Sequence, residues 1–107
     1  MLTRVVEVKA KSGKAKELAK TIYDKALPIL RGQTGFVDEV VLVSDTEPDH
    51  LLALSFWNRQ QDAERYNKEQ YPKVNELIAH LVETAPTVKT FNVDSSTTHK
   101  IAAGKAA

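Results

Sequence analysis

Two tyrosines are the side chains of this 107-residue sequence whose positions best suit chemistry. Tyr66 lies in a run of helix-forming residues and Tyr71 comes directly before Pro72, so both rings could line a cavity where the helix is broken. A phenol can orient a substrate oxygen or relay a proton. We therefore take Tyr66 as a catalytic candidate and Tyr71 as a substrate-binding candidate. The commoner role of a helical tyrosine is to pack with its hydroxyl exposed.

His80 is the one histidine of the sequence that falls in a predicted helix. A neutral imidazole is the obvious general base near neutral pH, so His80 is the second catalytic candidate. At 100° per residue, however, His80 lies at the flank of the apolar stripe of that helix. This angle favours a solvated histidine over a catalytic one.

Two other aromatic residues are candidates for a substrate pocket. Trp57 ends a predicted strand, where an indole can fill the gap between sheet and helix while its N–H reaches a polar partner. Tyr23 flanks the apolar stripe of the first predicted helix, and its hydroxyl could reach the same cavity. Core packing is the competing role for Trp57, and an exposed hydroxyl is the competing role for Tyr23.

Several classes of function are excluded or disfavoured by composition. Cysteine is absent, which excludes disulfides, thiolate nucleophiles and cysteine zinc sites. No two histidines share metal-ligand spacing, and the sequence has no phosphate loop, dinucleotide fingerprint or nucleophile elbow. Residues 32–94 carry eleven acidic and five basic side chains, so we expect no nucleic-acid partner.

The elements that must position these side chains follow from hydrophobic periodicity and from the prolines. Pro28 predicts a kink in the last turn of the first helix, and Pro72 predicts a break in the second helix near Gln70 and Tyr71. The predicted strands are residues 2–9, 36–44, 50–57 and 87–93, and the predicted helices are residues 14–31 and 59–83. The order β-α-β-β-α-β predicts a ferredoxin-like α+β fold with an antiparallel sheet and both helices on one face.

The chain reads as one domain over residues 1–94, followed by a polar tail, residues 95–107, that we expect to be mobile. No apolar run approaches the length needed to cross a bilayer, and the first residues do not resemble a signal peptide. We therefore expect a cytoplasmic protein without a membrane partner.

The hairpin strands are apolar on both of their faces. Residues 40–43 and 51–54 carry apolar side chains at both parities, whereas a strand with one wetted face should alternate apolar with polar. So short a chain has no second layer to cover the free face. We therefore predict a homodimer that pairs through the sheet face.

Two segments of the sequence resemble a known family. They are Gln33-Thr34-Gly35-Phe36 and, after the hairpin, residues 54–63, which read Leu-Ser-Phe-Trp-Asn-Arg-Gln-Gln-Asp-Ala. This pattern is similar to the antibiotic-biosynthesis monooxygenase domain, and the resemblance covers residues 2–94. It implies a dimeric α/β barrel with a pocket between the helices and the sheet, and it adds Phe36 to the substrate-binding candidates.

The family includes cofactor-free oxygenases of phenolic or quinol-like substrates, and for these the resemblance implies no metal, flavin or other cofactor. It also includes haem-degrading enzymes, but the places that match their functional residues hold Arg4-Val5-Val6, Tyr66 and Glu76. Without the axial histidine, we do not expect haem breakdown.

Three hypotheses of function remain. The first is a cofactor-independent monooxygenase that oxidises a small phenol or quinol with oxygen. The second is a non-catalytic dimeric barrel that binds a small apolar ligand or acts as an interaction module. The third, an RNA-binding domain, needs exposed aromatic and basic side chains on its strands, and residues 52–54 do not provide them.

Overall fold

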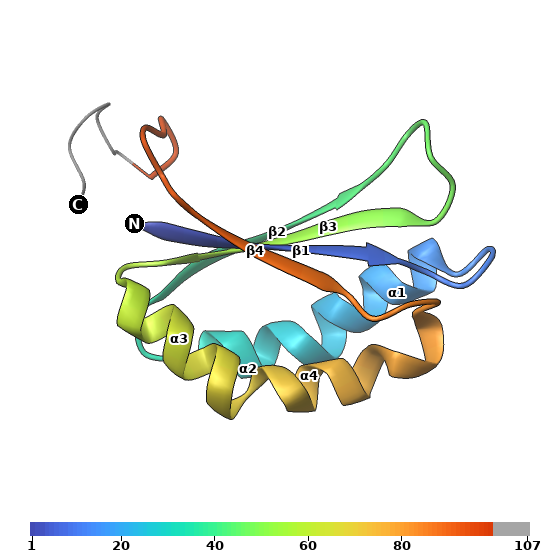
Figure 1. The fold of residues 1–107 in the computed structure, drawn as a ribbon, viewed down its shortest axis with the longest axis horizontal. Helices are drawn as coiled ribbons and strands as arrows, with labels where there is room; N and C mark the ends of the chain where they lie inside the picture. The colour runs from blue at the N-terminus through green and yellow to red at the C-terminus, as the bar shows by residue number, and fades with distance from the viewer. Residues whose placement is uncertain (100–107) are drawn as a thin grey trace.

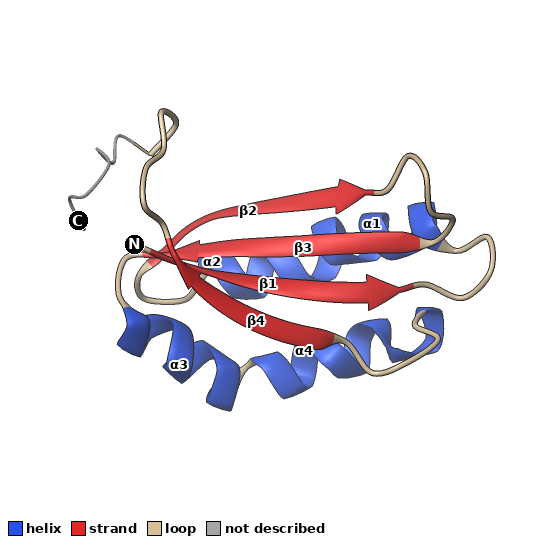
Figure 2. Ribbon diagram, turned by 45° about the horizontal axis from the view of Figure 1, so that its top comes forward, coloured by secondary structure: helices blue, strands red, loops and turns tan. Residues whose placement is uncertain are grey.

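Four antiparallel strands form one sheet in the order β2-β3-β1-β4 (Figure 2). The computed structural model describes residues 1–99. The strands are β1 (Leu2–Lys9), β2 (Phe36–Val43), β3 (His50–Trp57) and β4 (Thr87–Asn92). All helices of this part of the chain lie on one face of the sheet (Figure 1), which confirms the predicted ferredoxin-like α+β fold.

The first helical segment has an irregular middle. It consists of α1 (Ala15–Thr21), the π-helical turn η1 (Ile22–Ala26) and α2 (Leu27–Arg31). Pro28 has no N–H to donate to the carbonyl one turn earlier, and the wider π turn ends just before it. The distortion that Pro28 predicted is therefore present, but it lies one turn earlier than expected.

The second helical segment is broken where the sequence predicted. It consists of α3 (Gln60–Glu69), α4 (Tyr71–Ile78) and a short 3-10 turn, η2 (Ala79–Leu81). Pro72 occupies the first turn of α4, where its missing N–H costs no hydrogen bond. The break turns α4 relative to α3, and it places Tyr71 at the joint between them.

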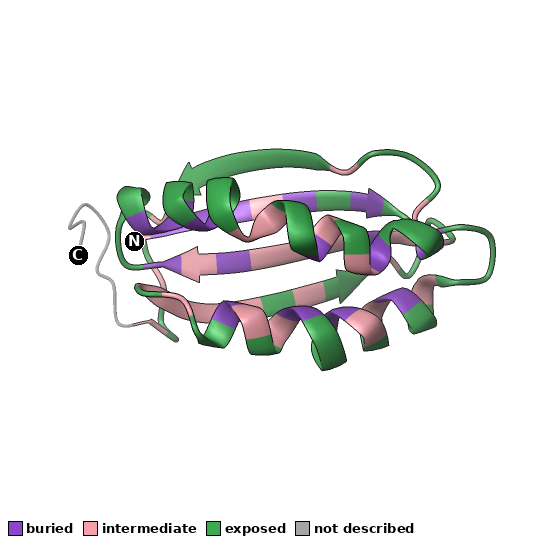
Figure 3. Cartoon of the chain, turned by 90° about the horizontal axis from the view of Figure 1, so that it is seen from below, coloured by how far each residue is buried: buried purple, intermediate pink, exposed green. Residues whose placement is uncertain are grey.

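The hydrophobic core lies between the helices and the two central strands (Figure 3). Strands β1 and β3 contribute buried residues to it, whereas every residue of β4 is exposed. Trp57 is fully buried at the end of β3 and packs edge-on against Phe36, with ring centres 5.7 Å apart. No helix within residues 1–99 is long and apolar enough to cross a membrane.

The opposite face of the sheet is only partly covered. Val40, Leu42 and Phe91 are exposed there. Residues 95–99, which belong to the predicted tail, pack back onto this face: the His99 ring lies 4.8 Å from the Phe56 ring, centre to centre. The rest of that tail prediction concerns residues 100–107, which lie outside the described residues.

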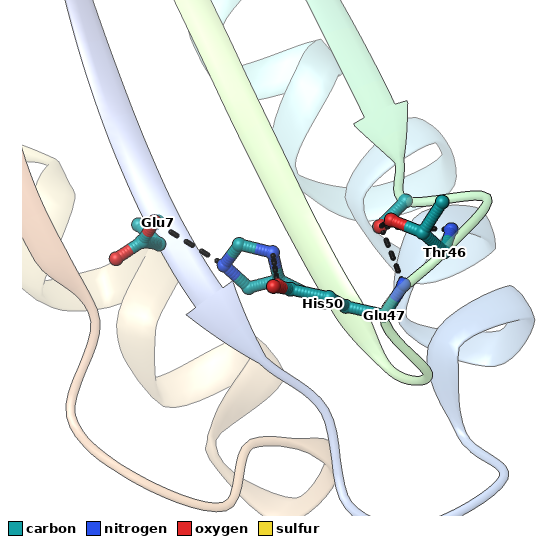
Figure 4. A network of polar contacts seen from close by, with 5 residues as sticks. Glu7, Thr46, Glu47 and His50 are labelled. Carbon is teal, nitrogen blue, oxygen red and sulfur yellow. Dashed lines mark hydrogen bonds and ion pairs between the residues drawn. The ribbon is translucent and has the colours of Figure 1, made fainter.

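The turn between β2 and β3 is held by a polar network (Figure 4). His50 lies between two carboxylates, with its Nε2 3.2 Å from Glu7 and its Nδ1 3.1 Å from Glu47. The Ser44 hydroxyl accepts a hydrogen bond from the Glu47 N–H at 2.9 Å. Both carboxylates are exposed, so these contacts fix the turn and add little free energy to folding.

Gly35 lets the chain pass close to the start of α3. Its φ is +82°, and a β-carbon at this position would collide with the carboxylate of Asp62. Asp62 is buried there and lies 3.4 Å from both Arg59 and Arg65. Glycine is therefore required at this position for two reasons: the backbone has a positive φ, and Asp62 fills the space that a β-carbon would need.

We expect Gly35→Ala to destabilise the protein more than Gly13→Ala. Both glycines have positive φ, but a β-carbon at Gly13 would meet no atom within 4 Å. Urea unfolding should show a loss of about 1 kcal/mol for Gly13→Ala, from backbone strain alone. The loss for Gly35→Ala should exceed it by about 1 kcal/mol or more, from overpacking. Equal losses would show that the contact with Asp62 does not restrict this position.

Candidate functional site

A row of polar residues crosses the sheet on its helix-facing side. The strand register places Ser55 opposite Glu39 on one side and opposite Arg4 on the other. Ser55 and Arg4 are buried, and Glu39 is half-buried. Polar groups in an otherwise apolar core are costly unless they are satisfied or functional, so this row is where a site is to be sought.

Arg4 is a buried cation without an anionic partner. Its side chain is covered by α3 and α4, and the residue is 3% exposed. Its Nη2 donates to Asn67 Oδ1 at 2.8 Å, and its guanidinium carbon lies 5.0 Å and 4.5 Å from the ring centres of Tyr66 and Tyr71. No carboxylate within residues 1–99 lies within 4 Å of it. Burial lowers the pKa of Arg4, but an arginine stays charged at neutral pH.

Tyr66 and Tyr71 remain neutral phenols in this environment. Burial raises the pKa of each hydroxyl, and the nearby Arg4 charge only partly offsets this. Neither can therefore act as a base near neutral pH, although both can donate a hydrogen bond. The Tyr71 hydroxyl and Asn75 Oδ1 are buried neighbours, yet neither has a hydrogen-bond partner of good geometry in the described chain. Both are available to a ligand or a water molecule.

Glu39 is the group of the row that titrates near neutral pH. Burial raises the pKa of its carboxyl to about 7, and the neighbouring Asp38 charge adds to this effect. Among residues 1–99, no cationic nitrogen lies within 4 Å of its carboxylate. Such a group can gain or lose a proton during a reaction at physiological pH.

Three hollows adjoin this row. One is a groove of about 340 Å³ between α3 and the edge strand β4, and Arg4 is among the residues that line it. Of the other two, the first is a small cavity of about 40 Å³ between the helices and the sheet, which can hold about three water molecules. The second is a groove of about 490 Å³ between the first helical segment and the edge strand β2. The pocket expected between helices and sheet therefore exists, but it is too small for an aromatic ring without rearrangement, whereas the groove beside β2 can accept one. The small cavity is lined by Arg4, Ser55, Tyr66 and Tyr71, among others. The groove beside β2 is lined by residues that include Tyr23, Leu27, Arg31, Phe36 and Val41.

The structure distributes the predicted substrate-binding residues between these places. Tyr71 lines the cavity together with the catalytic candidate Tyr66, and Tyr23 and Phe36 line the groove beside β2. Trp57 lines none of the three hollows. Its indole N–H donates to the Ser55 hydroxyl at 2.9 Å, and its ring centre lies 5.1 Å from that of Tyr66. Trp57 therefore contacts two residues that line the cavity without lining it itself.

His80 is not brought to any of these hollows. It lies exposed on η2, in agreement with its angle at the flank of the apolar stripe. His50 and His99 belong to the contacts on the other face of the sheet. Within the described part of the chain, no three His, Cys, Asp or Glu side chains lie together as ligands for a metal ion.

The sequence did not lead us to expect that Arg4 is buried. It also did not lead us to Glu39 as a candidate site residue. A signal for Arg4 was present, because in a strand it shares one face with Leu2, Val6 and Val8. Glu39 likewise shares a face with Val41, but a register shift between Phe36 and Asp38 precedes it. Only the strand order shows that the two polar residues flank the same serine.

We expect the carboxyl of Glu39 to make folding less favourable as pH rises. Its pKa is 4.5 ordinarily and about 7 in the folded protein, so the folded state holds this proton more tightly than the unfolded state. The stabilisation is complete below about 4.5 and is lost as pH rises to about 7. Urea unfolding of wild type and Glu39→Gln should show that the variant gains stability relative to wild type across this interval.

Glu76→Gln is the matched control, because Glu76 is exposed on α4. Its difference in stability from wild type should not change with pH over the same interval. Parallel stability curves for wild type and Glu39→Gln would mean that the carboxyl of Glu39 is solvated like that of any surface glutamate.

The chain matches one described protein family. The family description antibiotic biosynthesis monooxygenase matches residues 1–74, which is more than half of the chain. No curated protein matches the chain.

Several solved structures share its fold at low sequence identity. One is a candidate antibiotic biosynthesis monooxygenase from Bordetella bronchiseptica, with a TM-score of 0.74 and 11% identity, which covers 86% of this chain and 95% of that one. A second is SnoaB, a cofactor-independent oxygenase from Streptomyces nogalater, with a TM-score of 0.73, 12% identity and coverages of 90% and 95%. A third is a protein of unknown function from Nitrosomonas europaea, with a TM-score of 0.74, 18% identity and coverages of 90% and 91%.

At such identities the likeness to these structures establishes the fold and carries no activity with it. The family match is independent of that likeness and spans β1 through the start of α4. The chain belongs to the antibiotic biosynthesis monooxygenase family.

Proposed function

We propose that the protein is a cofactor-independent oxygenase of a small phenol or quinol. The observation that carries this proposal is the polar row at the junction of the groove and the cavity, where a titrating carboxyl and an unpaired buried cation adjoin a space of aromatic size. Membership of the family and the fold shared with SnoaB, itself a cofactor-independent oxygenase, are consistent with it.

The substrate ring lies in the groove against Leu27, Phe36 and Val41, and its hydroxyl points toward the polar row. The positive charge of Arg4 favours the ionised substrate, because no carboxylate of the described chain neutralises that charge. The neutral hydroxyls of Tyr66 and Tyr71 can donate hydrogen bonds to the substrate or to oxygen in the cavity.

The ionised ring then reacts with dioxygen directly. One oxygen atom bonds to a ring carbon that bears hydrogen, and the other leaves as water after the ring loses that hydrogen. A phenol and O₂ thereby give a quinone and water, so the substrate itself is the reductant and no bound cofactor is consumed.

The second candidate function is ligand binding without turnover. The small volume of the cavity between helices and sheet and the exposure of His80 are the observations that favour it. A protein of this kind would bind a phenol in the groove but would not consume oxygen.

We also propose that two copies pair through the outer face of the sheet. On that face Val40 lies opposite Leu54, and Leu42 lies opposite Leu52. The side chains of Val40 and Leu42 remain exposed, and residues 95–99 cover only the end of the face near Phe56. An uncharged apolar centre of this kind suits a second copy of the same face, related by a twofold axis.

We expect oxygen uptake when the aerobic protein is given a panel of phenols and quinols. Arg4→Met should lower kcat/KM by about 100-fold, because it removes the charge that stabilises the anion. Arg4→Lys should restore part of this loss, and Lys73→Met, on the exposed surface of α4, should leave the rate unchanged. Tight phenol binding with no uptake by wild type would select the second candidate function instead.

We expect sedimentation to report a particle of twice 11.9 kDa for wild type. Leu42→Asp should give a folded particle of 11.9 kDa, because a buried unpaired charge is not tolerated at an apolar interface. Ala79→Asp, an apolar-to-acidic change on the helix side, is the matched control and should leave the dimer intact. A wild-type protein that sediments as a monomer at micromolar concentration would exclude this pairing.

A further inference from the structure

Glu39 connects two of the hollows. Of the residues in the described chain, it alone lines both the groove beside the edge strand β2 and the small cavity between helices and sheet. A ring that fills the groove cannot enter a cavity that holds about three water molecules. The polar end of such a ligand therefore stops at the junction, which is where the carboxyl of Glu39 lies.

Two other carboxylates that are buried or half-buried in the fold are already engaged. Asp38 accepts a hydrogen bond from the N–H of Glu39 at 2.8 Å and lies 3.4 Å from His99 Nε2. Asp62 lies between Arg59 and Arg65. Glu39, by contrast, pairs with no cation among residues 1–99, so its carboxylate is left for a group that enters from outside.

The groups that face Glu39 come from every element around the two hollows. Arg31 from α2 and Tyr23 from η1 share the groove with it, and Asp38 precedes it on β2. Arg4, Tyr66 and Tyr71 share the cavity with it, from β1, α3 and α4. The tyrosines are neutral donors, the arginines are cations, and Asp38 already contacts the Glu39 N–H and His99, which leaves Glu39 as the unengaged proton acceptor of this set.

We propose that Glu39 is the catalytic base that takes the hydroxyl proton of a phenolic substrate lying in the groove. The O–H bond of the substrate breaks, the proton moves to the Glu39 carboxylate, and the electron pair stays on the substrate oxygen. That oxygen then faces the polar row and the charge of Arg4. This inference rests on the proposed oxygenase function, because it assigns the step that forms the reactive anion.

Protonation of Glu39 removes the negative charge at the junction of the groove and the cavity, which would repel the new phenolate. The carboxyl lies next to an apolar cavity wall that includes Val6, Ile22 and Val74, so the neutral acid suits its surroundings. A base whose pKa lies near the working pH is also the most effective in such a transfer, and that of Glu39 is about 7. His80, the base that the sequence offered, is on the surface.

Two experiments, one on turnover and one on ligand binding, test the role of Glu39 separately. In the turnover arm, kcat/KM of wild type for a quinol should rise with pH and level off as Glu39 ionises. Glu39→Gln should lower it by about 10²- to 10⁴-fold and abolish this rise, and Glu39→Asp should restore part of the loss. Glu76→Gln, which changes an exposed carboxylate on α4 away from both hollows, should keep the wild-type rate and pH profile.

The binding arm uses p-nitrophenol, whose ionised form is yellow, and needs no turnover. In the wild-type complex, the phenol hydroxyl and the Glu39 carboxylate share one proton. The affinity for p-nitrophenol should therefore fall as pH rises above neutrality, because both groups then lose their protons and repel each other. Glu39→Gln should bind p-nitrophenol without this fall, because the carboxylate at the junction, which would repel the phenolate, is gone. Circular dichroism should show that both proteins are folded.

The two arms separate the possible failures. A pH-dependent loss of p-nitrophenol affinity in wild type but not in Glu39→Gln, with no oxygen uptake from any phenol, would support Glu39 and overturn the oxygenase function. Oxygen uptake by Glu39→Gln at the wild-type rate would overturn the role of Glu39 alone. Failure of wild type to bind p-nitrophenol, or an equal fall of affinity in both proteins, would also overturn it.

Discussion

The guanidinium of Arg4 lies inside the fold, beneath α3 and α4, and two tyrosine rings and one amide take the place of an anion. Burying a charge in this way is costly, and the aromatic faces offset only part of the cost. The break between α3 and α4 at Pro72 brings Tyr66 and Tyr71 to the same cation from two helices. A fold built only for stability would place an apolar side chain at position 4.

The sheet extends the effect of that buried charge to the edge strand. Its register aligns Arg4, Ser55 and Glu39 across three strands, so a cation and a titrating carboxyl lie on opposite sides of one serine. The serine itself is held by the indole of Trp57. The proposed chemistry therefore depends on the side chains that the order β2-β3-β1 brings side by side, because the fold alone does not decide the chemistry.

Most of the fold could be predicted from the sequence because it follows from local rules. Pro72 marked the start of α4 and Pro28 marked an irregular helix, since both effects depend only on a missing N–H. The site could be predicted only in part. Tyr66 and Tyr71 were found from their place at a helix break, whereas the partnership of Arg4 with Glu39 depends on strands that are distant in sequence. Trp57 and His80 were candidates by residue type, and packing decided their places.

The ionisation of Glu39 in the ligand-free protein most directly tests whether this carboxyl can act as a base near neutral pH. It can be followed by nuclear magnetic resonance of the side-chain carboxyl carbon, assigned by comparison with Glu39→Gln. A titration midpoint of about 7 is the result expected if the carboxyl faces an apolar cavity without a cation. A midpoint near the ordinary value of 4.5 would show that water or a cation already satisfies this carboxyl, and the site would lose its base.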